Sequence, residues 1–125
     1  MMLVIIIPYW RKCEVIAIKD FFIHQKRLKE LFVTVLENGV IYELQNSEKI
    51  IFGMKISPED NSYVLRKELT MNDFDNDSGK YRLLLRTSET NVNSGRYYWD
   101  CAVDSHNELY HIDSGRIIVA AAVVK

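Results

Sequence analysis

The sequence predicts an all-β, antiparallel sandwich of about seven to nine strands. Two observations carry this prediction: short runs of Val, Ile, Leu and Tyr alternate with turn residues, and one tight-turn triplet recurs three times. The length of 125 residues fits one domain, and no linker rich in Gly, Ser or Pro divides the chain. We therefore expect residues 1–125 to form a single domain. The sandwich would span 20–124, and residues 1–19 would add N-terminal strands whose place the sequence leaves open.

Three apolar runs in the first part of the chain suit short strands. They are Leu3–Ile7, Glu14–Ile18 and Phe21–Ile23. Pro8 ends the first run early, and no basic residue precedes it, so the start differs from a signal peptide. A membrane span needs about 20 apolar residues in a row, which the sequence does not contain. These features predict a chain made and folded in the cytoplasm, without a membrane span.

The segment His24–Leu36 fits two patterns. Its Leu, Phe and Val residues fall at helical spacing, but Leu31, Val33 and Val35 also alternate as in a strand. Asn38-Gly39 could end a helix, and it is also a strong hairpin turn. We favour a strand over residues 31–37, with a short helical turn near residues 25–30.

The remainder of the chain reads as strands. They are expected over Ile50–Ile56, Tyr63–Leu69, Tyr81–Arg86, Tyr97–Val103, Leu109–Ile112 and Ile117–Val124. Three triplets lead into such runs: Asp77-Ser78-Gly79, Asn93-Ser94-Gly95 and Asp113-Ser114-Gly115. Asx residues cap a turn locally and Gly accepts positive φ, so each triplet predicts a tight turn. In the strand 97–103, period-2 alternation puts Tyr97 and Trp99 on the core face and Tyr98 outside.

Composition excludes several function classes. The net charge of −1 gives no general basic field, so nucleic acid is not an expected partner. The two cysteines, Cys13 and Cys101, form no CxxC pair, which leaves buried thiols or a single disulfide as readings.

The stretch from about Asp20 to Val124 resembles the immunoglobulin-like domains of tailed phages and prophages, such as the N-terminal domain of siphophage baseplate upper proteins. The matching residues are Leu31 to Val35 followed by Glu37-Asn38-Gly39, then Tyr42-Glu43-Leu44, Glu48 to Phe52, Gly95 to Asp100, and a final strand led by Gly115. The resemblance implies an immunoglobulin-like sandwich that serves as a structural module of a tail or baseplate. It also implies protein partners, either other phage structural proteins or copies of itself, and a place in the virion. It carries over no catalytic residue.

Candidate reactive sites are weakly supported. The acidic loop Asp73–Asp77 lacks the Gly and Glu of an EF-hand, and two histidines, His106 and His111, do not complete a zinc site. Asp104-Ser105-His106 are adjacent in a turn, which is not the geometry of a catalytic triad. We therefore expect a non-catalytic protein with no cofactor and no metal.

Candidate protein-contact residues come from two kinds of segment. Tyr9, Trp10 and Arg11 form an aromatic and basic loop of the type enriched in interface hot spots, and Tyr98 points outward. Ile117 and Val119 lie in an apolar final strand that could pair with a partner at a sheet edge, as could the N-terminal strand. The alternative function is a carbohydrate-binding sandwich for cell-wall glycans, which would need exposed aromatic platforms.

Overall fold

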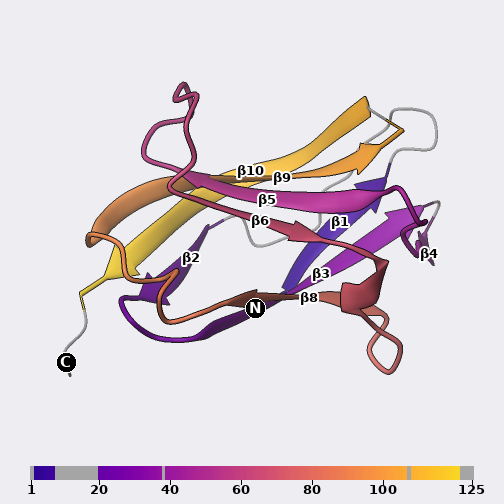
Figure 1. The fold of residues 1–125 in the computed structure, drawn as a ribbon, viewed down its shortest axis with the longest axis horizontal. Coiled ribbons are helices and arrows are strands. Elements are labelled where there is room, and N and C mark those ends of the chain that lie inside the picture. The colour runs from indigo at the N-terminus through magenta and orange to yellow at the C-terminus, as the bar shows by residue number, and fades with distance from the viewer. Residues whose placement is uncertain (1, 8–19, 38, 107, 122–125) are drawn as a thin grey trace.

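The computed structural model describes residues 2–7, 20–37, 39–106 and 108–121, which form two stacked β-sheets (Figure 1). The strands are β1 (Met2–Ile7), β2 (Asp20–His24), β3 (Lys29–Glu37), β4 (Val40–Ile41), β5 (Lys49–Lys55), β6 (Leu65–Leu69), β7 (Phe74–Asp75), β8 (Lys80–Leu85), β9 (Gly95–Ser105) and β10 (Glu108–Ala120). The all-β sandwich predicted from the sequence is confirmed. In the described part of the chain the strands number ten, because the two-residue strands β4 and β7 add to the eight longer ones.

The two sheets have different strand orders. The first sheet runs β1-β3-β8-β7, with β4 also paired to β3, and the second runs β2-β10-β9-β5-β6. Most neighbouring strands are antiparallel, as expected. Two pairs are parallel: β1 with β3, and β10 with β2. The expectation of a purely antiparallel sandwich is wrong for these two pairs.

The parallel pairs arise because strands close in sequence lie in different sheets. β1 and β3 share a sheet while β2 lies in the other one, and the three strands alternate in direction (Figure 1). β1 and β3 therefore lie side by side and point the same way. A reading of the sequence as successive hairpins assumes that consecutive strands are neighbours, which fails where the chain crosses between layers.

The core lies between the sheets and follows a strict period of two. The first sheet contributes the inner residues of β3 and β8, which are Leu31, Val33, Val35, Tyr81, Leu83 and Leu85. The second sheet contributes Phe21, Ile23, Ile50, Phe52, Met54, Tyr97, Trp99, Cys101, Val103, Ile117 and Val119. Trp99 lies near the centre of the second sheet, with its ring centroid 6.0 Å from that of Phe21 and 6.1 Å from that of Phe52. The predicted inner face of β9 is confirmed.

The ambiguous segment before residue 37 is a strand. β3 begins at Lys29, and Leu36 and Glu37 pair with Ile41 and Val40 across the predicted Asn-Gly turn. The expected helical turn near residues 25–30 is wrong. The N–H of Arg27 donates to the carbonyl of His24, and Lys26 has a φ of 58°, which is the left-handed region and incompatible with a right-handed helix. The described helical segment is instead a 3-10 helix over Met71–Asp73, capped by Thr70.

The three Asx-Ser-Gly triplets adopt different structures. Asp77-Ser78-Gly79 forms the predicted turn between β7 and β8, with Gly79 at a φ of 70°. Gly95 opens β9 after an irregular bend. The third triplet is not a turn, because it lies inside β10, where Ser114 pairs with Asp100. The triplet belongs to the strand because β9 extends alongside it and pairs with it. The register shifts at a β-bulge between His111 and Asp113.

Two tyrosine hydroxyls fasten loops to the sandwich. Tyr97, near the start of β9, donates to the carbonyl of Asn93 at 2.6 Å, the backward bond of the tyrosine corner of immunoglobulin-type sandwiches. Tyr81 is completely buried; its hydroxyl accepts from the N–H of Leu44 at 2.6 Å and donates to the carbonyl of Tyr42 at 3.1 Å. Tyr81 thereby ties the segment after β4 to the first sheet.

We predict that Tyr81→Phe lowers the free energy of unfolding by about 1–3 kcal/mol, because the buried N–H of Leu44 loses its acceptor. Urea denaturation measures this effect. The matched control is Tyr63→Phe, which removes a hydroxyl from an exposed ring and should leave the midpoint unchanged. Equal stability of the wild-type chain and Tyr81→Phe would contradict this role for the hydroxyl.

Candidate functional site

One candidate site is a groove on the outer face of the second sheet. We call it the outer groove. It has a volume of about 540 Å³ and is lined by Asp20, Lys55, Pro58, Tyr98, Trp99, Asp100, Ser114, Gly115 and Arg116. These residues come from β2, β5, β9, β10 and the loop between β5 and β6, which rises above the sheet (Figure 1).

Strand register assembles this groove from residues far apart in sequence. Arg116 on β10 lies opposite Asp20 on β2 and opposite Tyr98 on β9, and Tyr98 in turn lies opposite Lys55 on β5. One row therefore crosses four strands. In the next row, Asp100 lies between Ser114 and Gly53. Each row lies on the outer face because the alternate residues of the same strands fill the core.

The Asp20–Arg116 pair stands at one end of the groove. The Nη2 of Arg116 lies 2.8 Å from Oδ2 of Asp20, and its backbone N–H donates to Oδ1. Hydrogen bonding from the Arg116 side chain holds the pKa of Asp20 below its ordinary value, and the same bond raises the pKa of Arg116. Both side chains are about half exposed, so the pair orients two polar groups and adds little stability.

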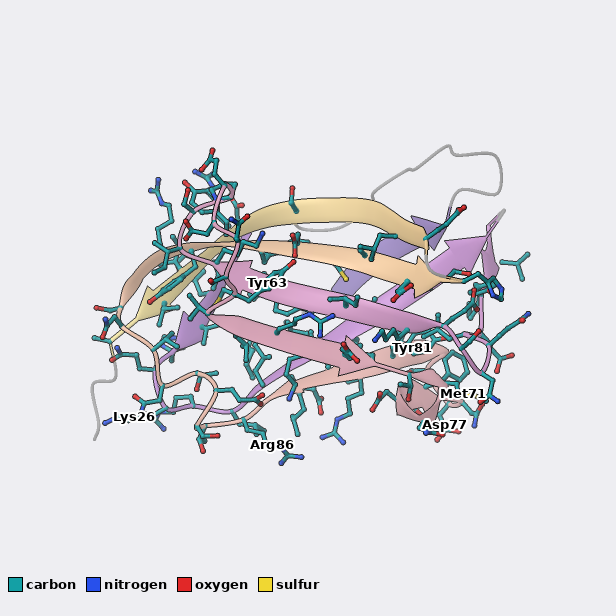
Figure 2. The ribbon with its side chains drawn as sticks, turned by 45° about the horizontal axis from the view of Figure 1, so that its top comes forward. Lys26, Tyr63, Met71, Asp77, Tyr81 and Arg86 are labelled. Carbon is teal, nitrogen blue, oxygen red and sulfur yellow. The ribbon has the colours of Figure 1, made fainter. Side chains whose placement is uncertain are left out.

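Beside the other end of the groove, Gly53 leaves room for the ring of Tyr63. A Cβ atom on Gly53 would lie 2.0 Å from Cε1 of Tyr63 and 3.0 Å from Oδ1 of Asp100. The Tyr63 ring therefore rests on the bare backbone of β5, where the long loop returns to the sheet (Figure 2). The Nζ of Lys55 lies 4.6 Å from the centre of that ring, within cation–π range.

A smaller hollow of about 310 Å³ continues from the outer groove. It shares Asp20 and Arg116 and is bordered by Phe22, Ile118 and Arg96. Phe22 lies opposite Ile118 and is 62% exposed, the largest aromatic exposure among the described residues. This part of the sheet is apolar and basic, unlike the balanced charges of the outer groove.

A buried carboxylate lies away from the groove. Glu48 accepts hydrogen bonds from the hydroxyls of Tyr42 and Ser105 and from the N–H of Gln45. Burial would raise the pKa of Glu48, but the three hydrogen bonds outweigh it and hold the pKa below its ordinary value of 4.5. These bonds join the turn before β5 to the end of β9, so Glu48 is structural rather than a reactive acid.

The residues singled out by sequence have mixed outcomes. Tyr98 lies in the outer groove, half-buried. Ile117 and Val119 are buried in the core, at 0% and 2% exposed, and β10 is hydrogen-bonded to β2 on one side and β9 on the other. The expectation that the final strand offers a free edge is therefore wrong. Tyr9, Trp10 and Arg11, like the strand expected over 14–18, lie outside the described residues.

The other sequence candidates have local structural roles. Asp73 accepts from the N–H of Thr70, and Asp75 accepts from the N–H of Asp77 and the hydroxyl of Ser78. The hydroxyl of Ser105 donates to Glu48 rather than facing a base. In the described ranges, no three His, Cys, Asp or Glu side chains gather as metal ligands would.

The remaining sequence candidates are histidines and cysteines. His106 is exposed at the tip between β9 and β10, and the side chain of His111 lies outside the described residues. Cys101 is buried in the core, and Cys13 is not among the described residues. Within the described part of the chain, no helix is long and apolar enough to cross a membrane.

Sequence reasoning missed the outer groove apart from Tyr98, and it also missed Glu48. The groove depends on register between strands up to 96 residues apart, which no local pattern reports. Gly53 in the middle of an apolar run is the one available signal, because a glycine inside a strand often marks close approach of another group.

Comparison with known proteins gives a structural match. The fold is similar to the N-terminal domain of phage TP901-1 ORF48, with a TM-score of 0.51 and 11% sequence identity. The alignment covers 94% of this chain and 97% of that chain, so the likeness concerns the whole sandwich. No protein-family model matches the sequence, and no curated protein matches it. At this identity the match establishes a shared fold.

We predict that Gly53→Ala displaces the Tyr63 ring and lowers the free energy of unfolding by about 1 kcal/mol, through overpacking and loss of the Lys55 contact. A double-mutant cycle in urea measures the coupling. In a Tyr63→Ala background the Cβ has room beside it, so the same Gly53→Ala change should cost much less. Equal costs in both backgrounds would show that the ring does not rest on Gly53.

We predict that Glu48 makes stability depend on pH below about pH 4.5, its ordinary pKa. Because the pKa of Glu48 is lower in the folded state, its contribution is complete above that pH and disappears as the pH falls through the folded value. Glu48→Gln should lower the unfolding free energy at pH 7 by about 1–3 kcal/mol, since the amide cannot accept from all three donors.

Parallel urea titrations of wild type and Glu48→Gln from pH 7 to pH 3 check this prediction. The difference in unfolding free energy between the two proteins should become smaller as the pH approaches 3. The other carboxylates are the same in both proteins, so their contributions cancel in this difference. A difference that stays constant with pH would rule out the ionised carboxylate as the stabilising species.

Proposed function

We propose that this chain is a non-catalytic assembly domain of a phage or prophage, associated with the tail or baseplate and acting through protein–protein contacts. The observation that carries the proposal is the fold likeness to a phage domain over nearly the full length of both chains. The sequence resemblance to immunoglobulin-like phage domains over residues 20–124 points the same way.

The interior of the sandwich supports a structural role. The space between the sheets is filled by apolar side chains, and the buried polar side chains among the described residues are Glu48 and Thr90. Both are engaged in holding loops: Thr90 donates to the carbonyls of Arg27 and Thr87, and Glu48 joins two turns. The buried polar groups therefore hold loops in place, which suits a structural role.

The edge strands β6 and β1, one from each sheet, differ in their suitability for strand pairing. β6 carries Arg66, Lys67 and Glu68 in succession, and Lys67 forms an ion pair with Glu89 at 2.8 Å. Charged residues of this kind discourage pairing with another chain. β1 consists of six apolar residues, and in the described structure it pairs with β3 alone. We assign β1 as the edge that adds to a strand of a partner or of a second copy.

Exposed apolar side chains give a second contact region. Val40 and Ile41 on β4 are 67% and 47% exposed, and Met71 is 47% exposed. β4 and the 3-10 helix that carries Met71 lie toward the same end of the sandwich (Figures 1 and 2). Singly exposed apolar residues are ordinary, but several at one end of a small domain suit a protein contact.

We predict that the purified chain self-associates at high concentration, or joins other tail proteins in the virion. Light scattering coupled to size-exclusion chromatography measures the first outcome, and immunogold labelling of virions from cells that encode the chain measures the second. A strictly monomeric chain that is also absent from virions would overturn the proposal.

Two lysine variants test the assigned edge. Val4→Lys and Ile5→Lys place a charge on consecutive residues, which face opposite sides of a strand, so one of them leaves the core face unchanged. The variant that keeps the wild-type thermal midpoint should lose association. Arg66→Lys, on the charged edge strand β6, is the control and should associate as wild type.

A further inference from the structure

We propose that the outer groove binds a neutral oligosaccharide. This inference goes beyond the assembly role and does not depend on it, because the groove lies on the outer face of the second sheet and β1 lies at the edge of the first. The occupant follows from the charges, the hydrogen-bonding groups and the aromatic surface of the groove.

The charge balance of the lining favours an uncharged ligand. Its ionisable acids and bases number two of each, namely Asp20 and Asp100 against Lys55 and Arg116. Asp20 and Arg116 neutralise one another at 2.8 Å, and the ammonium of Lys55 lies over the Tyr63 ring. An anion would meet the carboxylate of Asp100, and a cation would meet Lys55. A polyhydroxyl ligand carries no charge to be repelled by either.

The hydrogen-bonding groups suit vicinal hydroxyls. A carboxylate offers two acceptor oxygens, a guanidinium offers donors in a fixed fork, and neighbouring hydroxyls of a sugar both donate and accept. Arg116 and Asp100 supply these groups from adjacent strands, in adjacent rows of the register. The paired Asp20 fixes the direction of the Arg116 fork, so less side-chain freedom is lost on binding.

The aromatic surface comes from Tyr98. It lies between Arg116 and Lys55 in the cross-strand row and is half-buried, so part of its ring faces the groove. An aromatic ring with a polar tip provides apolar area for the C–H face of a sugar. The other aromatic residue of the lining, Trp99, is only 2% exposed because its side chain lies in the core.

The size and rigidity of the groove also suit an oligosaccharide. Its volume of about 540 Å³ lies within the range of small-molecule sites, about 300–1,000 Å³. The polar and aromatic side chains of the lining stand on four hydrogen-bonded strands. The loop between β5 and β6, whose Tyr63 ring packs on Gly53, adds Pro58 to the lining. A site on strands is better preorganised than one on loops alone.

Calorimetric titration tests the inference with three neutral linear tetrasaccharides, one each of glucose, galactose and N-acetylglucosamine. At least one should bind the full chain with a Kd of about 1 mM or tighter. Tyr98→Ala and Asp100→Asn should each weaken that binding about tenfold or more, by loss of the stacking surface or of an acceptor oxygen. The thermal midpoint of each variant, measured in parallel, confirms folding, and Asp100→Asn preserves the side-chain volume.

Arg82→Ala, on the outer face of the first sheet, is the matched control and should bind as wild type. A tetraglutamate peptide, titrated in the same way, distinguishes a charged ligand. The inference is overturned if none of the three saccharides binds, if binding survives both groove variants, or if the peptide alone binds. Self-association measured on the same variants stays unchanged if the assembly role and the groove are separate.

Discussion

The register of β9 against β5 and β10 is the constraint on which the rest of the structure depends. In this register Trp99 faces Phe52 and Phe21 in the core, and Tyr98 and Asp100 face outward. A slip by one residue would reverse every side chain of the strand, burying Asp100 and exposing Trp99. Because such a slip would be costly, the same register determines both which residues form the core and which line the outer groove.

This constraint separates the roles of the two faces of the second sheet. In the described part of the chain, the inner face is lined by the apolar residues of one continuous core cluster. Chemistry and recognition are left to the outer face, the edges and the loops. The likeness to a phage domain at 11% identity shows that very different sequences adopt this sandwich fold.

Much of the local structure could be predicted from short-range patterns. The strands β5 and β8 could be predicted from apolar runs bounded by turn residues, and β3 and β9 also from alternation within the strand. The Asn-Gly hairpin could be predicted because that dipeptide suits a two-residue turn. Where short-range patterns competed, tertiary pairing decided. Asp113-Ser114-Gly115 has the composition of a turn, but it is a strand because β9 extends alongside it and pairs with it.

The candidate site was less accessible to sequence reasoning. Tyr98 was placed outside by alternation, but its neighbours Arg116, Lys55 and Asp20 are adjacent only through pairing between β2, β10, β9 and β5. The same limit explains Ile117 and Val119: their apolar character was evident, but not that their strand has neighbours on both sides.

The sequence by itself determined that this protein is all β and layered, and that Tyr97 and Trp99 face the space between the layers, because burial requires alternation within each strand and alternation is local. The tertiary structure alone decided the strand order, the two parallel pairs, the position of β10 inside its sheet and the assembly of the outer groove. The physical reason is that backbone hydrogen bonds can join any two strands, so side-chain patterns within one strand do not specify its neighbours.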